Sequence, residues 1–383
     1  MVAMGLATAQ EALDPFTVKG SDGATLAATP LEEFSSPWAL EFLPDGHAVV
    51  TEKEGKIWLL DEAGKKKAEI ANAPAVTAMG QGGMGDFIIH PDFAKTGTVY
   101  LSYVERDAAD DSLSGAVVER ATLSLDGDAP TLKDRDIIWR QSPKVRGNGH
   151  YGHRLAMSPD GHLFVTSGDR QKFVPAQNMD MSLGKVLRLK ADGSVPDDNP
   201  FVGRGGVAAQ VWTLGHRNPL GIDFDAKGRL WVHEMGPRDG DELNLIVRAE
   251  NYGYPTVSNG KHYTGTEIPD HDDIPVYMQP GAYWVPAISP AGFEIYEGDL
   301  FGAWQGDGFL GGMSSTALIR VTFDEKKIGE YMAAAKERQK PGMAKEAARY
   351  SWDARIREVE EGPDGAIYVL EDGDRLIKLM PAE

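Results

Sequence analysis

The sequence contains no cysteine among its 383 residues. Disulfides, thiolate metal sites and a cysteine nucleophile are therefore excluded. It also lacks an apolar run of the roughly 18 residues that a membrane-spanning helix needs, so we expect no membrane insertion. Basic residues are the minority: 39 Lys and Arg stand against 58 Asp and Glu, and the net charge is −19. Such an acidic chain is poorly suited to bind nucleic acid or an anionic membrane, and we expect neither as a partner.

Glycine and proline are abundant, with 44 and 23 residues, and they recur in one short phrase. The phrase is an apolar residue or its equivalent, then Pro-Asp-Gly or a variant, then an alternating apolar run. Pro presets a tight turn, Asp can bond the following backbone, and Gly accepts a positive φ. Repetition at this period indicates a four-stranded unit used six times. We therefore predict an all-β fold, a six-bladed β-propeller with four-stranded blades. The phrase occurs at 43–46, 90–93, 158–161, 225–228, 289–292 and 362–365.

Changes in composition along the chain predict where the propeller begins and which segments are added to it. We expect a single propeller over 13–383, with an edge strand within 13–32 that helps to close the ring. Residues 1–12 are small and apolar and read as the remnant of an export signal or a disordered tail. We favour the signal remnant, which predicts a periplasmic or secreted protein. The Ala/Glu/Lys-rich stretch 324–349 predicts a short helical insert, and 251–290 predicts a long loop over one face.

Four polar, Gly-rich segments lie at the same phase of the repeat, just upstream of a recurring turn: 80–86, 147–154, 215–219 and 354–358. Equal phase in a propeller means the same end of the central channel. A lone His or Arg is usually structural, but convergence would bring three cations together in an acidic protein. Guanidinium groups suit carboxylates or a quinone oxygen, and a neutral imidazole beside them can accept a proton. The converging side chains are those of Gln81, His150, Arg217, Arg355 and Arg357.

A fifth segment, 234–244, is dense in oxygen ligands and turn residues. This composition suits a hard cation such as calcium. An Asp/Gly-rich surface turn explains the same residues equally well, and its spacing is not that of an EF-hand.

Taken in order, these motifs resemble a known family. GQGG…HPDF, GHYG.RL, GHRNP.G, GPR.GDELN…NYGYP and RIREV..GPDG are similar to the soluble sugar dehydrogenases that use pyrroloquinoline quinone (PQQ), the aldose and glucose dehydrogenases with six-bladed propellers. The resemblance runs from residue 37 to about residue 379. It implies PQQ- and Ca²⁺-dependent oxidation of an aldose sugar at C1 to the lactone, with hydride passing to the quinone. The electron acceptor, and whether the protein is a monomer or a homodimer, stay open.

The resemblance also assigns roles around the quinone. His150 corresponds to the general base that takes the proton from the C1 hydroxyl. Arg217 corresponds to the residue that polarises the quinone oxygen, with Asn218 beside it. Gln81 corresponds to a glutamine near cofactor and substrate. Two further residues correspond to the arginines that hold the PQQ carboxylates: Arg355 and Arg357.

For metal and substrate the resemblance points to the fourth blade. Gly236 and Pro237 correspond to residues whose backbone carbonyls bind the calcium that activates PQQ. Glu242 and the backbone of Tyr252 correspond to a second, structural calcium site. Trp284 corresponds to an aromatic residue at the pocket wall, although an ordinary core tryptophan fits the sequence nearly as well.

The sequence departs from the best-known glucose dehydrogenases at two places. Ser314 lies near the position where they carry a PQQ-contacting lysine, and Gly149 stands where they have an acidic residue before the base. Two other functions remain as alternatives. A calcium-dependent lactonase-type propeller would need carboxylates and Asn around an axial metal. A non-catalytic binding module would predict loss of the base or of the cofactor arginines.

Overall fold

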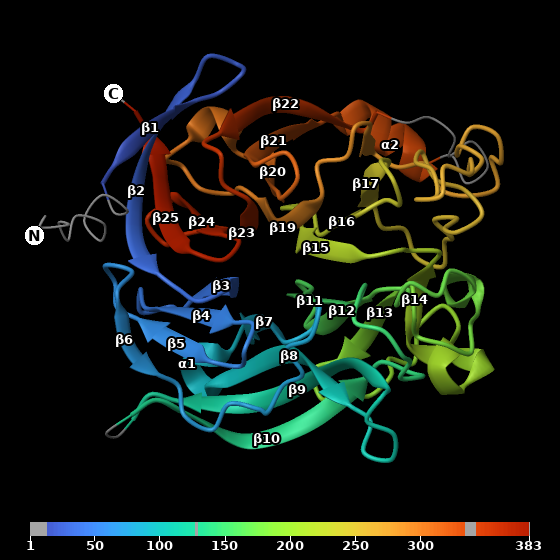
Figure 1. Ribbon diagram of the computed structural model, residues 1–383, viewed down its shortest axis with the longest axis horizontal. Helices are drawn as coiled ribbons and strands as arrows, with labels where there is room; N and C mark the ends of the chain where they lie inside the picture. Colours follow the sequence, from blue (N-terminus) through green and yellow to red (C-terminus); the bar gives the residue numbers. More distant parts are fainter. Residues whose placement is uncertain (1–13, 127–128, 334–341, 383) are drawn as a thin grey trace, which may run out of the picture.

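The computed structural model describes residues 14–126, 129–333 and 342–382. Its strands form six antiparallel sheets around a central axis (Figure 1). Five of the described sheets have four strands and the sixth has five. The predicted six-bladed β-propeller is therefore confirmed. The predicted N-terminal segment 1–12 lies outside the described residues.

The strands of each blade follow one another in sequence, from the channel outward. Blade 1 contains β3 (Pro37–Phe42), β4 (Ala48–Glu52), β5 (Ile57–Leu60) and β6 (Lys66–Glu69). Blade 2 contains β7 (Met84–Ile89), β8 (Thr98–Arg106), β9 (Ser114–Ser124) and β10 (Thr131–Arg140), with α1 (Phe93–Thr96) after its first strand. Blade 3 contains β11 (Gly152–Met157), β12 (His162–Ser167), β13 (Lys185–Lys190) and β14 (Val211–Leu214), with the short 3-10 helices η2 (Val174–Gln177), η3 (Val202–Arg204) and η4 (Gly206–Gln210) in its loops. Blade 4 contains β15 (Pro219–Phe224), β16 (Leu230–Glu234), β17 (Asp241–Leu245) and β18 (Ala282–Trp284). Blade 5 contains β19 (Pro290–Ile295), β20 (Gly308–Gly312), β21 (Ala317–Phe323) and β22 (Ala344–Ser351), with η5 (Gly302–Trp304) and α2 (Glu325–Ala333) in its loops.

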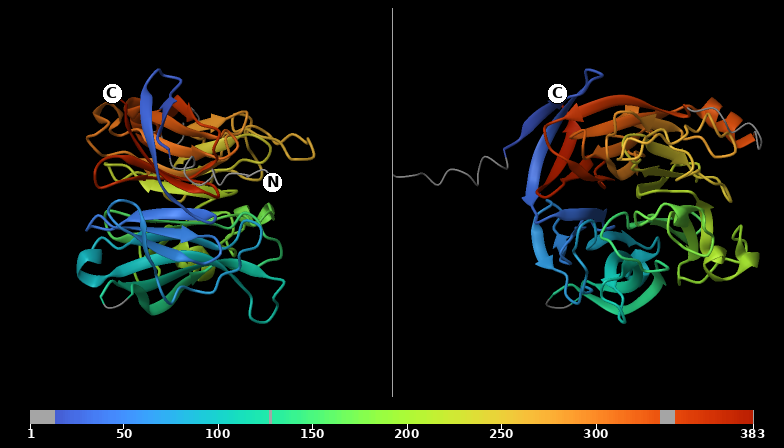
Figure 2. Two further views of the ribbon diagram at one scale, coloured as in Figure 1. Left: turned by 60° about the vertical axis from the view of Figure 1, so that its left-hand side comes forward. Right: turned by 45° about the vertical axis from the view of Figure 1, so that its right-hand side comes forward.

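The sixth blade joins the two ends of the chain. Its strands are β23 (Ile356–Glu361), β24 (Ile367–Glu371), β25 (Arg375–Pro381), β2 (Thr25–Glu33) and β1 (Phe16–Lys19). Leu26 pairs with Pro381 in the antiparallel ladder between β2 and β25, and the N-terminal hairpin lies against the C-terminal strands in every view (Figures 1 and 2). The predicted closing strand is confirmed. Closure pairs strand edges that would otherwise be free to aggregate.

The recurring turn joins the inner strand to the second strand in most blades. Gly46, Gly161, Gly228 and Gly365 have φ of 88°, 82°, 70° and 73°, the conformation that only glycine adopts without strain. In blade 2 the equivalent position is taken by α1, which ends on Gly97 at a φ of 64°. The turn chemistry inferred from the sequence therefore places the inner strands correctly.

One prediction about local structure is wrong, and another holds for part of its range. The fifth phrase, 289–292, is not a turn: its last three residues belong to the inner strand β19, and the turn of that blade lies between β19 and β20 and contains η5. The predicted short helical insert is present as α2 (Glu325–Ala333), whereas Ala344–Ser351, at the end of the predicted stretch, forms β22. Ala348 and Tyr350 are buried there, so pairing with β21 overrides the helix propensity of Ala, Glu and Lys.

Candidate functional site

A cavity of about 410 Å³ lies at one end of the channel. Its wall comes from the beginnings of the inner strands and from residues that follow the second strands. This is the end of the channel where the Gly-rich segments were predicted to meet. The lining residues are Ser36, Pro37, Trp38, Lys53, Gly80, Gln81, Tyr151, Gly152, His153, Asn218, Leu220, Met235, Ser289, Met313, Arg355, Arg357, Asp372 and Gly373.

The structure places four of the six predicted cofactor residues on the wall of this cavity, whereas His150 and Arg217 are not among its lining residues. Gln81, Asn218, Arg355 and Arg357 lie on its wall, although they come from three different blades. His150 is joined to this wall, because its backbone N–H donates to the Gln81 side-chain oxygen at 2.7 Å. Residues far apart in sequence therefore form one polar site.

His150 is held by a buried carboxylate that the sequence analysis did not single out. Its Nδ1 lies 2.7 Å from Oδ1 of Asp169, and Asp169 is fully buried. An ionised carboxylate only accepts, so Nδ1 carries the proton and Nε2 keeps a free lone pair. Burial lowers the pKa of His150, the hydrogen bond to Asp169 opposes this shift, and the Arg217 charge adds to it. The imidazole is thus a neutral base near physiological pH.

The loop that carries His150 has a strained backbone conformation and is held in place by hydrogen bonds from Arg170. His150 has a φ of 49°, a region that non-glycine residues rarely adopt. The buried Arg170 donates to the Gly149 carbonyl at 2.9 Å and to the Ser114 carbonyl at 2.6 Å, and its guanidinium lies 3.7 Å from the centre of the Tyr151 ring. A Cβ atom at Gly149 would meet the Gln171 amide at 2.8–2.9 Å. Gln171 therefore fills the space that a side chain at position 149 would need.

Arg217 is held by hydrogen bonds from its backbone N–H and its Nη1, whereas its Nε has no partner among the described residues. Its backbone N–H donates to Glu234, and its Nη1 donates to the Met235 carbonyl at 2.9 Å. Nε of Arg217 and Oδ1 of Asn218 are buried and have no hydrogen-bond partner among the described residues. Buried polar atoms without partners are rare and call for a ligand, ion or water. Both atoms belong to residues that the sequence assigned to the cofactor.

Arg355 and Arg357 are paired by one acidic residue on the cavity wall. Nε of Arg355 lies 2.9 Å from Oδ2 of Asp372, and Arg357 donates to Oδ1 at 2.7 and 3.0 Å. Although burial opposes the shift, Arg357 and Arg355 lower the pKa of Asp372. Two guanidinium groups against one carboxylate leave a net positive charge. Lys53 adds another cation to the wall and donates to the Gly80 carbonyl at 2.6 Å.

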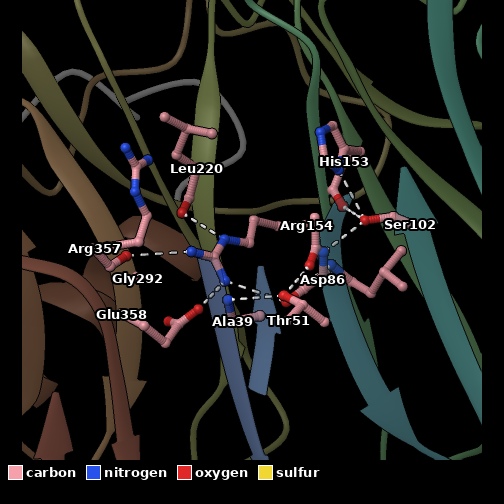
Figure 3. A network of polar contacts seen from close by, with 12 residues as sticks. Ala39, Thr51, Asp86, Ser102, His153, Arg154, Leu220, Gly292, Arg357 and Glu358 are labelled. Carbon is pink, nitrogen blue, oxygen red and sulfur yellow. Dashed lines mark hydrogen bonds and ion pairs between the residues drawn. The ribbon is translucent and has the colours of Figure 1, made fainter. Parts of the chain in front are cut away.

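The floor of the cavity is a buried ion pair on the channel axis. Arg154, the third residue of β11, reaches Asp86 at 3.2 Å and also pairs with Glu358, which are the third residues of their own inner strands. Its Nε donates to the Leu220 carbonyl at 3.0 Å, and its guanidinium lies 4.0 Å from the centre of the Trp38 ring. Figure 3 shows this network. One side chain from blade 3 thus contacts four other blades and divides the channel.

A second imidazole lines the cavity beside this floor. His153 stacks on Trp38 with ring centres 5.2 Å apart, and its Nδ1 lies 2.8 Å from the Ser102 hydroxyl. Burial and the Arg154 charge lower the pKa of His153 to about 3. The sequence analysis gave this residue no role. It is a neutral part of the wall.

Below Arg154 the channel is acidic. Four inner strands carry a carboxylate at their fifth residue, and burial, with repulsion from neighbouring carboxylates, raises the pKa of each side chain. For Asp223 the raised pKa is about 7. These residues, which we call the acid ring, are Glu41, Asp223, Glu294 and Glu360.

The acid ring makes stability depend on pH. Because the folded pKa values are raised, the ring favours the fold at acidic pH, and this contribution is lost as pH rises from about 4 through the folded pKa values. We expect Glu360→Gln to raise the free energy of unfolding at pH 8 by about 1 kcal/mol and to have little effect at pH 4. Denaturation at both pH values measures this, with the exposed Glu62→Gln as a control of equal charge change. An equal effect of the two variants at pH 8 would contradict the prediction.

The predicted calcium carbonyls lie next to the cavity. Gly236 and Pro237 are buried and follow Met235, which lines the cavity. The Gly236 N–H donates to Oδ1 of Asp241 at 2.8 Å, while Oδ2 of Asp241 accepts from the backbone N–H groups of Ile288 and Ser289, both at 2.7 Å. Asp241 therefore fixes this turn against the blade 5 side of the cavity.

Glu242 and Tyr252 lie deeper within blade 4, and neither lines the cavity. Oε1 of Glu242 lies 3.0 Å from Nε2 of His271, and Oε2 accepts from the Asn244 amide at 3.3 Å. Tyr252 stacks on His216 with ring centres 4.7 Å apart. Oδ1 of Asn244 is buried without a hydrogen-bond partner in the described part of the chain. Within that part, no group of three or more His, Asp or Glu side chains is arranged to hold a metal.

Trp284 does not lie at the pocket wall. It is buried on the outermost strand of blade 4, within the core between blades 4 and 5, and is absent from the lining of the cavity. Its Nε1 donates to Glu346 on β22 at 2.7 Å. The core alternative that the sequence left open therefore describes its position.

Fold and site together define a six-bladed propeller whose channel ends in a basic cavity with a carboxylate–imidazole pair beside it. Residues 34–378 match the Glucose / Sorbosone dehydrogenase family, and the chain belongs to that family. It is 34% identical to the aldose sugar dehydrogenase YliI of Escherichia coli over 356 residues, which are 91% of each chain.

Solved structures agree with this placement. The soluble aldose sugar dehydrogenase of E. coli in its apo-form superimposes with a TM-score of 0.84 at 34% identity, covering 93% of this chain and all of that one. The PQQ-bound aldose sugar dehydrogenase of Streptomyces coelicolor shares the fold, with a TM-score of 0.74 at 24% identity over 96% of this chain and 99% of that one. None of the described helices has the length and apolar character needed to span a membrane.

Proposed function

We propose that the protein oxidises aldose sugars at C1 to the lactone, with PQQ as the oxidant and His150 as the general base. The observation that carries the proposal is the pairing of His150 with Asp169 at 2.7 Å, next to a cavity lined by Arg355 and Arg357. The relatives of the chain are sugar dehydrogenases. Oxidation of a sugar carbon needs an acceptor for the hydride. PQQ is a flat quinone that carries three carboxylates, and the positive charges on the wall of the cavity suit these carboxylates.

The residues of the chain account for the proton chemistry. Nε2 of His150 accepts the proton of the C1 hydroxyl, and Asp169 stabilises the imidazolium that forms. As this proton leaves, C1 gives up its hydrogen as hydride and its oxygen becomes the carbonyl of the lactone. Arg217 supplies a fixed positive charge where negative charge develops on the acceptor.

The residues present fit PQQ. Arg355, Arg357 and Lys53 line a cavity of about 410 Å³, and Nε of Arg217 is a buried donor with no partner in the described residues. Arg355 and Arg357 would hold its carboxylates, and Arg217 and Asn218 would contact its quinone edge. When bound, PQQ supplies an electrophilic carbonyl that accepts hydride.

We include calcium in the proposal. The carbonyls of Gly236 and Pro237 and the unpaired Oδ1 of Asn218 are oxygen ligands of the kind that Ca²⁺ prefers. Calcium there would supply a Lewis acid next to the quinone edge. A second calcium at Glu242 and Tyr252 stays a prediction, because both carboxylate oxygens of Glu242 already have protein partners.

The lactonase and binding-module alternatives receive less support. The lactonase needs carboxylates and Asn around an axial metal, whereas this cavity wall carries three basic side chains, Arg355, Arg357 and Lys53, against one carboxylate. The binding module predicts loss of the base or of the cofactor arginines, and these residues are retained.

We also propose export to the periplasm or the medium, which N-terminal sequencing of the mature protein tests.

Reconstitution tests the proposed function. The purified protein is loaded with PQQ and Ca²⁺, supplied with a panel of aldoses, and followed by reduction of an artificial dye. We expect dye reduction that requires PQQ and falls after chelation of calcium. If the protein binds PQQ but reduces no dye with any aldose, the proposal fails.

Asp169→Asn tests how the base is positioned. The neutral amide keeps the shape but removes the charge that raises the pKa of His150 and fixes its tautomer. We expect kcat to fall about 10- to 100-fold and the acidic limb of the kcat/KM profile to move to lower pH. A pH-rate series of both enzymes measures this. A lower kcat without a shift of the acidic limb of the kcat/KM profile would mean that Asp169 has only a structural role.

A further inference from the structure

A fully buried lysine in blade 3 takes no part in the chemistry described so far. Lys185 is the first residue of β13, and none of its surface is exposed. Its Nζ donates to the carbonyls of Pro175 and Leu183, both at 2.8 Å, and to the Ala176 carbonyl at 3.0 Å. An ammonium group has three N–H donors, so these three backbone carbonyls use all of them.

Holding an ammonium group at this place costs stability. Burial lowers the pKa of Lys185 to about 7, whereas a lysine in an unfolded chain has a pKa of about 10.4. The charged form is therefore less stable in the folded protein than in the unfolded chain, and the fold loses stability at neutral pH. A methionine of similar length would fill the space without this loss. The benefit must then come from the segments that the ammonium group holds together.

The loop that this ammonium group holds supports the segment that leads to Arg217. The Ala176 carbonyl also accepts from the Gly215 N–H at 3.0 Å, and the Gly184 carbonyl accepts from the His216 N–H at 3.2 Å. The contact is close, since a Cβ atom at Gly184 would lie 2.6 Å from the Ala176 Cα and from the His216 carbonyl oxygen. The position of the backbone before Arg217 therefore depends on this loop.

The other end of the same loop reaches both Arg217 and the base. The Asp169 N–H donates to the Arg217 carbonyl at 2.8 Å, and Oδ1 of Asp169 lies 2.7 Å from Nδ1 of His150. The loop between β12 and β13 thus contacts the chain on both sides of Arg217, and it contacts His150 through Asp169. Its conformation sets the distance between the two residues.

We infer that Lys185 is a positioning residue, whose ammonium group fixes Arg217 relative to His150 by holding three carbonyls of the loop between them. This inference rests on the proposed function, because it concerns the geometry of the same site. A fixed charge stabilises a transition state only where it is already in place when charge develops. A displacement of about 1 Å in such a site can lower the rate about 100-fold.

Substitution of Lys185 tests the inference. Lys185→Met keeps the length of the side chain and removes its three donors. We expect kcat per bound PQQ to fall about 10- to 100-fold, while KM for glucose changes less than about twofold, because the lost interaction acts in the transition state. Lys185→Gln, whose amide offers two N–H donors, should give a kcat between those of Lys185→Met and the wild type. Lys190→Met is the matched control at the exposed end of the same strand, and it should retain the wild-type kcat.

Two further measurements separate positioning from a purely structural role and from the proposed function. A structural role alone would lower the midpoint of thermal unfolding and leave kcat per bound PQQ unchanged, which would overturn the inference. If the wild type oxidises no aldose, amide hydrogen exchange still decides. The Gly215 and His216 amides should exchange at least about tenfold faster in Lys185→Met than in Lys190→Met, and equal rates would overturn the inference. If Lys185→Met does not fold, Lys185→Gln takes its place with the same outcomes.

Discussion

His150→Ala is expected to abolish sugar oxidation while PQQ still binds. Nδ1 of this imidazole lies 2.7 Å from the buried Asp169, which leaves Nε2 as the proton acceptor. Loss of a general base lowers kcat by about 10²- to 10⁴-fold, and we expect a loss within this range. Stopped-flow reduction of the bound quinone by glucose measures the effect on the oxidation step itself.

The matched control for this variant is His162→Ala. His162 lies near Asp160 at 3.1 Å in the turn at the other end of the inner strand of blade 3, so its loss should leave turnover unchanged. Quinone reduction at the wild-type rate in His150→Ala, with PQQ bound, would remove His150 from the mechanism.

Removal of Arg357 should cost most of the affinity for PQQ. The guanidinium is half-buried against Asp372, and its loss would leave that carboxylate facing an anionic ligand. Truncation of one partner in a buried charge pair costs about 2–5 kcal/mol, so the Kd for PQQ should rise at least about 30-fold. Fluorescence or absorbance titration of PQQ into the calcium-loaded protein measures this without relying on turnover.

Arg355 provides a graded comparison for Arg357. Its side chain is 52% exposed, against 16% for Arg357, so Arg355→Ala should weaken binding by less. Arg357→Lys keeps the charge but loses the two-point contact, and its Kd should fall between those of the wild type and Arg357→Ala. Equal PQQ affinity in all of these variants would mean that the carboxylates of PQQ are held elsewhere.

The architecture could be read from the sequence because it repeats a local signal. Pro-Asp-Gly turns with positive-φ glycines at Gly46, Gly161 and Gly365 mark the end of an inner strand wherever they occur. Position relative to these turns then predicts which segments meet at the same mouth of the channel. The prediction fails where the same residue types occur inside a strand: Pro290 and Gly292 belong to β19 itself and form no turn.

The residues that hold the site together could not be assigned in the same way. Asp169 and Asp372 each lie just after the second strand of a blade. This shared position could have marked both residues as candidates for the same end of the channel. Their roles, however, depend on the His150 and Arg357 partners that they meet only in three dimensions. Arg154 belongs to one of the motifs found in the sequence. Its position on the channel axis was not predicted, because it depends on the third residue of each inner strand facing the channel.

Propensity and residue type misled where tertiary contacts decide. The Ala- and Lys-rich β22 is a strand because it pairs with β21 and buries Tyr350. Trp284 is a core residue because its ring lies between two blades.

A single-turnover reaction tests the central claim most directly. The protein with one equivalent of bound PQQ and Ca²⁺ is mixed anaerobically with glucose, and the absorbance of the bound cofactor and the sugar product are followed together. The account predicts one gluconolactone formed for each PQQ reduced. Bound PQQ that stays oxidised in the presence of saturating glucose and every other aldose tried would contradict it.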